Sequence, residues 1–218
     1  MFNTEGFFET LTVKTLTMKN LSSFFVILLL VGCQKDLVEM PVLAPDVPVI
    51  IDTTPVYTKY TIFKGQHYCD KTAVKSFSDK EMSFKVIFDS TAIYTTLDPV
   101  NQGDINKLVG FTEGIDNHIN SARIGWGWNK NALRLYAYVY ANSVRSFKEI
   151  STVAIGAVIT CKIGISEKQY SFEVDDKKVA LNRAIEGPAV AGYWQYPYFG
   201  GDEVAPGNIY IYMLDIKK

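Results

Sequence analysis

Residues able to move a proton or hold a polar ligand are concentrated between positions 117 and 140. These candidates are His118, Asn120, Arg123, Tyr136, Tyr138 and Tyr140. A tyrosine or histidine can act as a general base, and an arginine or asparagine can neutralise a carboxylate on a substrate. Aromatic rings edged by polar groups also match the flat C–H faces and hydroxyl rims of sugars. The segment therefore predicts polar-ligand binding or acid–base chemistry.

A β-hairpin predicted from Ser121 to Ala141 positions most of these side chains. Two runs of alternating polarity meet at Asn129-Lys130-Asn131, and asparagine tolerates the positive φ of a primed two-residue turn. With that turn at either Asn129-Lys130 or Lys130-Asn131, one face carries Trp126, Trp128, Leu133 and Leu135. The other face carries Arg123, Gly125, Gly127, Arg134, Tyr136, Tyr138 and Tyr140. We prefer the two-residue turn because it gathers these apolar side chains on one face, which we assign to the core. A slip of one residue would move the side chains of one strand to the opposite face.

The polar face of this hairpin is the predicted ligand site. Gly125 and Gly127 leave a shallow floor beneath Tyr136 and Tyr138. The ligand-binding residues that we predict are Asn120, Arg123, Arg134, Tyr136, Tyr138 and Tyr140. If the site is catalytic, its candidates are Tyr136, Tyr138, Arg123 and His118. A structural interpretation is also open, in which the tyrosines cover bare glycine backbone or line the core.

The rest of the chain predicts short antiparallel strands around this hairpin. Alternation with a period of two recurs in Phe84–Phe88, Tyr170–Val174 and Ile209–Met213, which is typical of strands with one buried face. A second hairpin is expected from Gln169 to Leu181, with its bend at Asp175-Asp176. Because no amphipathic helix is found, the sequence predicts an all-β fold.

The predicted fold class is an antiparallel β-sandwich spanning residues 57–218. The order of elements from Ala132 to Leu181 is similar to the core of concanavalin-like and laminin-G-like jelly rolls, with Asp176 in place of the usual turn glycine. This resemblance implies a jelly roll. Segments 117–123 and 197–206 also resemble uncharacterised lipoproteins of Bacteroidetes-type bacteria, a family that implies no activity.

Jelly rolls of this type include glycosidases and polysaccharide lyases. Glycosidases with the strand motif Glu-x-Asp-x-x-Glu need two carboxylates about 5 Å apart. The nearest match, Glu173-Val174-Asp175, has Lys178 where the second glutamate should stand, which argues against this activity. The lyases place a tyrosine or histidine beside an arginine or asparagine, and those residue types are present. Their Gln-x-His strand motif is absent.

Metal chemistry has few candidates in the sequence. The chain contains only two histidines, His67 and His118, far apart in sequence, so we predict no zinc-type site. A structural Ca²⁺ ion held by Asp202 and Glu203 beside a glycine turn is an alternative, because hard cations prefer oxygen ligands. No other cofactor is expected.

The N-terminal segment predicts export and lipid attachment. Lys19 precedes an apolar run that is too short to span a bilayer. Leu30-Val31-Gly32-Cys33 resembles the lipobox of bacterial lipoproteins, in which the cysteine thiol is lipidated. We therefore expect a signal peptide and lipobox at residues 1–33 and a proline-rich tether at 34–56. Gln34 after the cysteine favours the outer membrane of the cell envelope.

Two cysteines remain for the body of the domain, Cys69 and Cys161. An exported protein occupies a compartment in which a disulfide can persist. Cys161 also lies on the apolar side of an alternating run, which suits a buried thiol. The sequence leaves a Cys69–Cys161 disulfide and two free thiols as equal alternatives.

Charge balance limits the choice of partner. Lys and Arg total 22 and Asp and Glu total 23, a balance that does not favour a nucleic-acid partner. Our leading hypothesis is a lipid-anchored cell-envelope protein whose jelly roll binds carbohydrate or a similar polar ligand without transforming it. The alternatives are a polysaccharide lyase acting on uronate-containing glycans and a protein-binding adhesion or assembly module.

Overall fold

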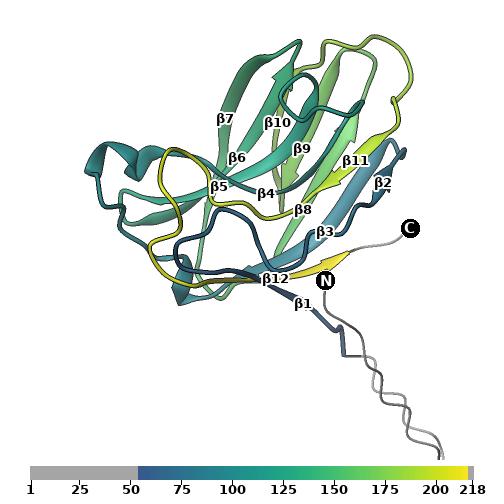
Figure 1. The fold of residues 1–218 in the computed structure, drawn as a ribbon. Coiled ribbons are helices and arrows are strands. Elements are labelled where there is room, and N and C mark those ends of the chain that lie inside the picture. Colours follow the sequence, from purple (N-terminus) through teal and green to yellow (C-terminus); the bar gives the residue numbers. More distant parts are fainter. Residues whose placement is uncertain (1–53, 216–218) are drawn as a thin grey trace, which may run out of the picture. The chain divides into compact units, whose positions relative to one another are not determined.

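The computed structural model describes residues 54–215, which form two antiparallel β-sheets (Figure 1). The predicted signal peptide, the lipidation site Cys33 and most of the proline-rich tether lie outside the described residues. Within residues 54–215, no helix is long and apolar enough to cross a membrane. Two 3₁₀ helices, η1 (Ser90–Ala92) and η2 (Pro99–Gly103), are the helical elements of this part of the chain.

Each sheet has six strands, and neighbouring strands are antiparallel. The first sheet has, in spatial order, β1 (Thr58–Ile62), β12 (Ile209–Asp215), β3 (Glu81–Phe88), β8 (Ile159–Ile165), β9 (Gln169–Val174) and β10 (Lys177–Asn182). The second sheet has β2 (Ser76–Phe77), β11 (Gly192–Gln195), β4 (Asn106–Thr112), β5 (Ser121–Asn129), β6 (Ala132–Ala141) and β7 (Val144–Val153). This arrangement confirms the predicted antiparallel sandwich.

Aromatic side chains from the two sheets fill the space between them. The rings of Phe88 (β3) and Trp126 (β5) are 5.3 Å apart, and those of Phe111 (β4) and Tyr170 (β9) are 6.0 Å apart. All four side chains are fully buried, and such burial contributes about 25 cal/mol per Å² of apolar area. Because side chains alternate along a strand, the outer face of the second sheet is left to polar and mixed residues.

The two predicted hairpins are confirmed, and the first has the two-residue turn that the sequence favoured. Asn129 pairs with Ala132, so the turn holds two residues, Lys130 and Asn131, with φ of 52° and 55°. Both values are positive, as a primed turn requires. Trp126 pairs with Leu135 inside the core, and Trp128 packs partly buried at its edge.

The second hairpin joins β9 to β10. Val174 pairs with Lys177, so the bend lies at Asp175 and Asp176. Asp175 has a φ of 50°, a conformation that aspartate tolerates better than most residues. The next residue, Asp176, stands where the jelly rolls that this segment resembles have a turn glycine.

A buried ion pair joins the two sheets at one end. Glu113, directly after β4, accepts hydrogen bonds from Arg183 Nη2 at 2.6 Å and Nε at 2.7 Å, and from the Tyr170 hydroxyl at 2.5 Å. Both charged side chains are fully buried. Arg183 also donates to the Gly187 carbonyl, and the Val190 N–H donates to Glu113. The pair therefore fixes the loop that leads into β11.

The cysteines of the described domain are not bridged. Cys69 and Cys161 are both buried free thiols. Cys161 lies inward on β8, whereas Cys69 lies in the segment after β1 and forms an isolated bridge with Ile62. The disulfide alternative is therefore wrong for this structure, and the buried-thiol alternative holds.

Candidate functional site

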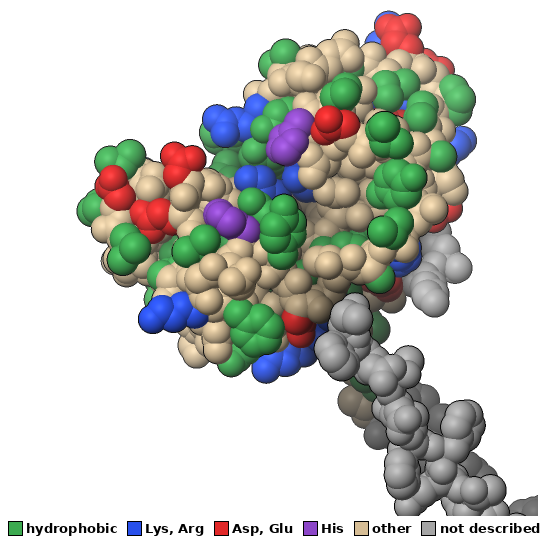
Figure 2. Space-filling view, in the orientation of Figure 1, with side chains coloured by type: hydrophobic (Ala, Val, Ile, Leu, Met, Phe, Trp, Pro, Cys, Tyr) green, Lys and Arg blue, Asp and Glu red, His purple; other side chains and the backbone are tan. Residues whose placement is uncertain are grey.

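A cleft of about 370 Å³ opens on the outer face of the second sheet. We call it the aromatic cleft. It is lined by Tyr68, Thr72, Lys107, Asn117, His118, Arg123, Tyr138, Tyr140, Arg145, Trp194, Gln195, Tyr196, Pro197 and Tyr198. Figure 2 shows this face of the molecule, with lysine and arginine side chains (blue) between the two histidines (purple). The cleft residues on β5 and β6 alternate with core residues, which turns them away from the first sheet.

Arg123 lies at the base of the aromatic cleft, and its side chain is held rigidly. The residue is 6% exposed. Its Nη2 donates to the carbonyl of Asn117 at 3.1 Å and to Ser121 Oγ at 3.2 Å. The guanidinium carbon lies 5.4 Å from the ring centre of Tyr138 and 5.8 Å from that of Tyr140. Its Nε has no hydrogen-bond partner within the described structure.

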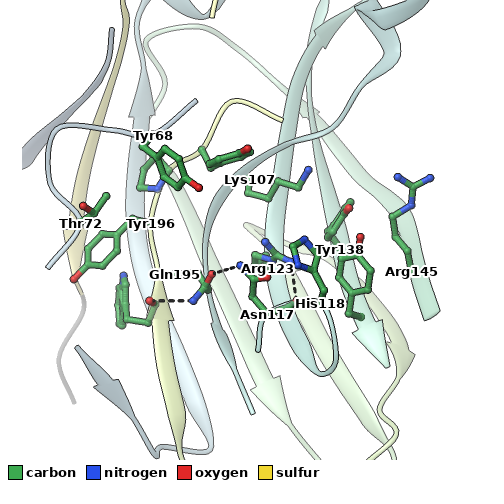
Figure 3. Close-up of a pocket in the computed structure, with 14 residues that line it drawn as sticks. Tyr68, Thr72, Lys107, Asn117, His118, Arg123, Tyr138, Arg145, Gln195 and Tyr196 are labelled. Atoms are coloured by element: carbon green, nitrogen blue, oxygen red, sulfur yellow. Dashed lines mark hydrogen bonds between the residues drawn. The ribbon is translucent and has the colours of Figure 1, made fainter. Parts of the chain in front are cut away.

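Lys107 approaches the same tyrosine from β4. Its Nζ lies 4.8 Å from the ring centre of Tyr138 and donates to the carbonyl of Ile105 at 2.9 Å; the side chain extends into the cleft in Figure 3. Burial, reinforced by the positive charge of Arg123, lowers the pKa of Lys107 to about 8. A Cβ at Gly200 would lie 2.6 Å from the backbone carbonyl oxygen of Ile105, which accepts the Lys107 hydrogen bond, so glycine is needed for this close approach of the two backbone segments.

Aromatic side chains from outside the hairpin form the opposite wall. Tyr68 is 66% exposed and packs edge-on against Tyr198, with ring centres 5.0 Å apart. His67 stacks on the same Tyr198 ring at 5.3 Å and bonds through Nδ1 to the carbonyl of Phe199. These contacts hold Tyr198 in place, and Tyr68 is left free to meet a ligand.

The amide side chains of Asn117 and Gln195 bridge the cleft between the β4–β5 loop and β11. Asn117 Nδ2 donates to Gln195 Oε1 at 3.3 Å, as drawn in Figure 3. The backbone carbonyl of Asn117 also accepts a hydrogen bond from Arg123 Nη2. Amides of this kind both donate and accept hydrogen bonds, so they are suited to contact ligand hydroxyl groups.

Tyr136 and Tyr138 of the hairpin remain protonated at neutral pH. Burial, with a contribution from Tyr140, raises the pKa of Tyr138 to about 12. Burial also raises the pKa of Tyr136. Their hydroxyl groups are therefore hydrogen-bonding groups and not phenolates.

The structure brings four of the predicted site residues together. Arg123, Tyr138, Tyr140 and His118 all line the aromatic cleft. His118 is exposed, and its ring packs edge-on against Tyr140 at 5.2 Å. These residues lie at the end of the hairpin far from its turn.

Three other predicted ligand-binding residues do not line the cleft. Asn120 accepts a hydrogen bond from the Asn142 N–H at 3.0 Å and braces the β6–β7 turn. Arg134 is paired with Glu149, and Tyr136 packs edge-on against another ring on β7. These three side chains lie outside the cleft and make contacts with neighbouring residues of the same sheet and its turns.

The glycine floor predicted beneath Tyr136 is not open. A Cβ at Gly125 would lie 2.5 Å from Ile105 Cγ2, and one at Gly127 would lie 3.3 Å from the carbonyl oxygen of Asp104. The segment preceding β4 therefore covers both glycines. The glycines serve close packing of backbone, and the cleft lies beside them, over Arg123.

Sequence reasoning missed several residues of the cleft. Lys107 and Arg145 lie on strands whose neighbours in the sheet were not predicted, and Tyr68 lies in a loop. The aromatic run from Trp194 to Tyr198 is conspicuous in the sequence. This density of aromatic residues was the signal available in the sequence, because aromatic side chains commonly line ligand sites.

The predicted Ca²⁺ ligands have other contacts. Glu203 accepts hydrogen bonds from the N–H groups of Leu97 and Asp98, each at 2.8 Å, and from Asn101 Nδ2 at 2.9 Å. These bonds lower the pKa of Glu203 and anchor η2. Asp202 is exposed. Among the described residues, no cluster of three or more His, Cys, Asp or Glu side chains is placed to hold a metal ion.

The residues nearest to a glycosidase motif lie away from the aromatic cleft. Glu173 is on β9 in the first sheet and pairs with Lys178 at 3.0 Å. None of the residues that line the cleft is acidic. The cleft therefore lacks the pair of carboxylates that glycoside hydrolysis of the usual kind requires.

Comparison with known proteins gives the fold of the chain. No protein-family model and no curated protein matches the sequence. A solved Bacteroides ovatus mixed-linkage-glucan GH16 protein, in complex with a product, has a TM-score of 0.50 at 10% identity, over 75% of this chain and 81% of that one. An alginate lyase has a TM-score of 0.49 at 10% identity, over 72% of each chain. The first likeness agrees with the jelly roll that the sequence resemblance implied.

Proposed function

We propose that this domain binds carbohydrate in the aromatic cleft without transforming it. The observation that carries the proposal is the cleft's lining of six aromatic side chains, Tyr68, Tyr138, Tyr140, Trp194, Tyr196 and Tyr198. Sugar C–H faces pack on aromatic rings, and the amides of Asn117 and Gln195 are available to the hydroxyl rim. A volume of about 370 Å³ suits a short oligosaccharide segment, because small-ligand sites span roughly 300–1,000 Å³.

Two features of the cleft support binding over catalysis. The lining contains no carboxylate that could serve as nucleophile, acid or base. The pKa of Tyr138, about 12, leaves little phenolate at neutral pH, and a general base works best when its pKa is near the working pH. The B. ovatus protein of this fold was solved with a glucan product, which supports a carbohydrate ligand for this chain.

One observation favours the lyase alternative. Arg123 lies beside Tyr138 and Tyr140, with His118 at the edge of the same cluster, a set that could neutralise a uronate and move a proton. Incubation of the purified chain with uronate polysaccharides, followed by absorbance of the unsaturated product, tests it. We expect no absorbance change above a protein-free blank, and a sustained increase would establish the lyase.

Binding itself is tested on a glycan array with the purified full-length chain. We expect Tyr68→Ala to weaken the signal about two- to tenfold, because the exposed ring supplies a stacking contact. Tyr193→Ala is the matched control, since Tyr193 is an exposed tyrosine of β11 outside the cleft. An array with no glycan signal, together with capture of a protein partner, would instead support an adhesion or assembly module.

We further propose that the chain is exported and held in the cell envelope by a lipid on Cys33. The lipobox-like Leu30–Cys33 and the short apolar run before it support this. Each buried methylene of an acyl chain contributes about 0.8 kcal/mol, and two chains anchor stably. Labelled fatty acid should enter the wild-type chain and not Cys33→Ser, and equal labelling of both would contradict the anchor.

A further inference from the structure

Three basic side chains from three strands converge on the aromatic cleft. They are Lys107 of β4, Arg123 of β5 and Arg145 of β7. Figure 3 shows them around Tyr138. Burial lowers the pKa of Lys107, and the positive charges of Arg123 and Arg145 lower it further. The negative charge of Asp104 acts in the opposite direction. The cleft is thus a local concentration of positive charge in a chain that is nearly neutral as a whole.

Among residues 54–215, no acidic side chain lines the cleft. In the described part of the chain, Lys107, Arg123 and Arg145 belong to none of the ion pairs. The Nε of buried Arg123 lacks a hydrogen-bond partner there as well. By contrast, Arg134 on the same face of the hairpin bonds both carboxylate oxygens of Glu149, at 2.9 and 3.0 Å.

Clustered cations without counter-ions are costly, and the cost is greatest where a charge is buried. A ligand that brings its own anion removes that cost. We propose that the aromatic cleft recognises an acidic glycan, whose carboxylate or sulfate group lies among Lys107, Arg123 and Arg145 while its sugar rings pack on the tyrosines. This inference rests on the proposed carbohydrate binding and adds the charge of the ligand. Guanidinium groups suit the role because their planar donors match paired anionic oxygens.

The test compares matched glycans on the purified full-length chain. One panel holds uronate oligosaccharides beside their carboxyl-reduced counterparts, and the other holds sulfated oligosaccharides beside their desulfated counterparts. We expect the charged member of a bound pair to bind about tenfold more tightly, since hydrogen bonds to charged groups are the stronger ones. A preference in the first panel identifies carboxylate as the anion, and one in the second identifies sulfate. Equal binding of charged and neutral members would overturn the acidic-glycan inference and leave carbohydrate binding intact, whereas absence of binding to all glycans would contradict both.

Single variants locate the anion. Lys107→Gln should weaken binding of the charged glycan about tenfold. Arg145 is at an exposed position, so Arg145→Gln should weaken this binding at least about twofold. Both variants should weaken binding of a neutral glycan less than binding of the charged one. Arg134→Gln is the matched control, because Arg134 lies on the same face outside the cleft, and it should leave binding within about twofold of wild type. Because Arg145 is exposed, its variant keeps the fold, which circular dichroism verifies. Wild-type affinity in both Lys107→Gln and Arg145→Gln would overturn the inference.

Discussion

The Glu113 carboxylate is a single buried group on which the stability of the domain depends. Burial by itself raises the pKa of a carboxyl group, but the hydrogen bonds from Arg183 and Tyr170 outweigh it, and the pKa of Glu113 lies below its ordinary value. A group whose pKa is lowered by folding stabilises the fold above its unfolded pKa. This contribution is lost as pH falls through the folded pKa.

We predict that Glu113→Gln lowers the free energy of unfolding by about 3 to 5 kcal/mol at pH 7, because it leaves the buried Arg183 without its counter-charge. The difference from wild type should shrink as pH falls below about 4, the ordinary pKa of a glutamate, towards the lower pKa of the folded Glu113 carboxyl. Urea denaturation at pH 7 and at low pH measures both effects. Glu173→Gln, which removes a partly exposed partner of Lys178, should cost less than about 1 kcal/mol. Similar losses in the two variants would contradict this assignment.

Lys107 should make binding of an acidic glycan depend on pH. With a pKa of about 8, its ammonium group is charged at pH 7 and largely neutral at pH 9, so affinity should fall between them. Arg123 and Arg145, which face it, keep their charge throughout this range. Calorimetric titration at the two pH values measures the change. Lys107→Arg should bind equally at both, and the same pH dependence in that variant would assign the effect to another group.

At the scale of elements, the turn between β5 and β6 sets the register of the hairpin that carries Arg123 and Tyr138. Asn131 is exposed with a φ of 55°, a conformation that glycine adopts freely and β-branched residues strongly disfavour. We predict that Asn131→Ile lowers the free energy of unfolding by about 1 to 2 kcal/mol, whereas Asn131→Gly does not. Thermal unfolding of the two variants measures this, and equal melting temperatures would show that the turn does not limit stability.

The strand pattern of this hairpin was predictable because it is local. Alternation along the chain and the two asparagines around Lys130 define both the strands and the turn, and the inward face of Trp126 follows from the register. Arg123 and Tyr138 could therefore be placed on the same face of the hairpin from the sequence. Their direct pairing in the structure follows from the turn at Lys130 and Asn131, one of the two turn positions that the sequence allowed.

The other half of the cleft depends on strand order, which local alternation does not contain. Lys107 reaches Tyr138 because β4 lies next to β5, and Trp194 enters the wall because β11 lies next to β4. The contact between β11 and β4 joins residues far apart in sequence, such as Trp194 and Phe111. The covering of Gly125 by Ile105 is likewise non-local. This is why the predicted glycine floor was wrong, whereas the face shared by Arg123 and Tyr138 was predictable from local alternation.

At the scale of the whole molecule, the sandwich is held by packing and hydrogen bonds without a covalent cross-link among the described residues. Burial raises the pKa of both Cys69 and Cys161, which makes their thiols unreactive in the folded state.

We predict that dithiothreitol leaves the melting temperature of a Cys33→Ser chain unchanged. In the same chain, a thiol reagent should react with two groups only after denaturation. A melting temperature that falls in reductant would show that Cys69 and Cys161 are bridged.

The anchoring of the loop before β11 by the pair Glu113 and Arg183 has a consequence for how ligands arrive. The cleft wall from Trp194 to Tyr198 follows this loop and is held in place before a ligand arrives. We therefore expect little conformational entropy to be lost when the ligand binds. Stopped-flow mixing should therefore show a single association phase whose rate rises linearly with ligand concentration. In Glu113→Gln, loosening of that loop should add a slower, concentration-independent phase as the wall reassembles around the bound molecule.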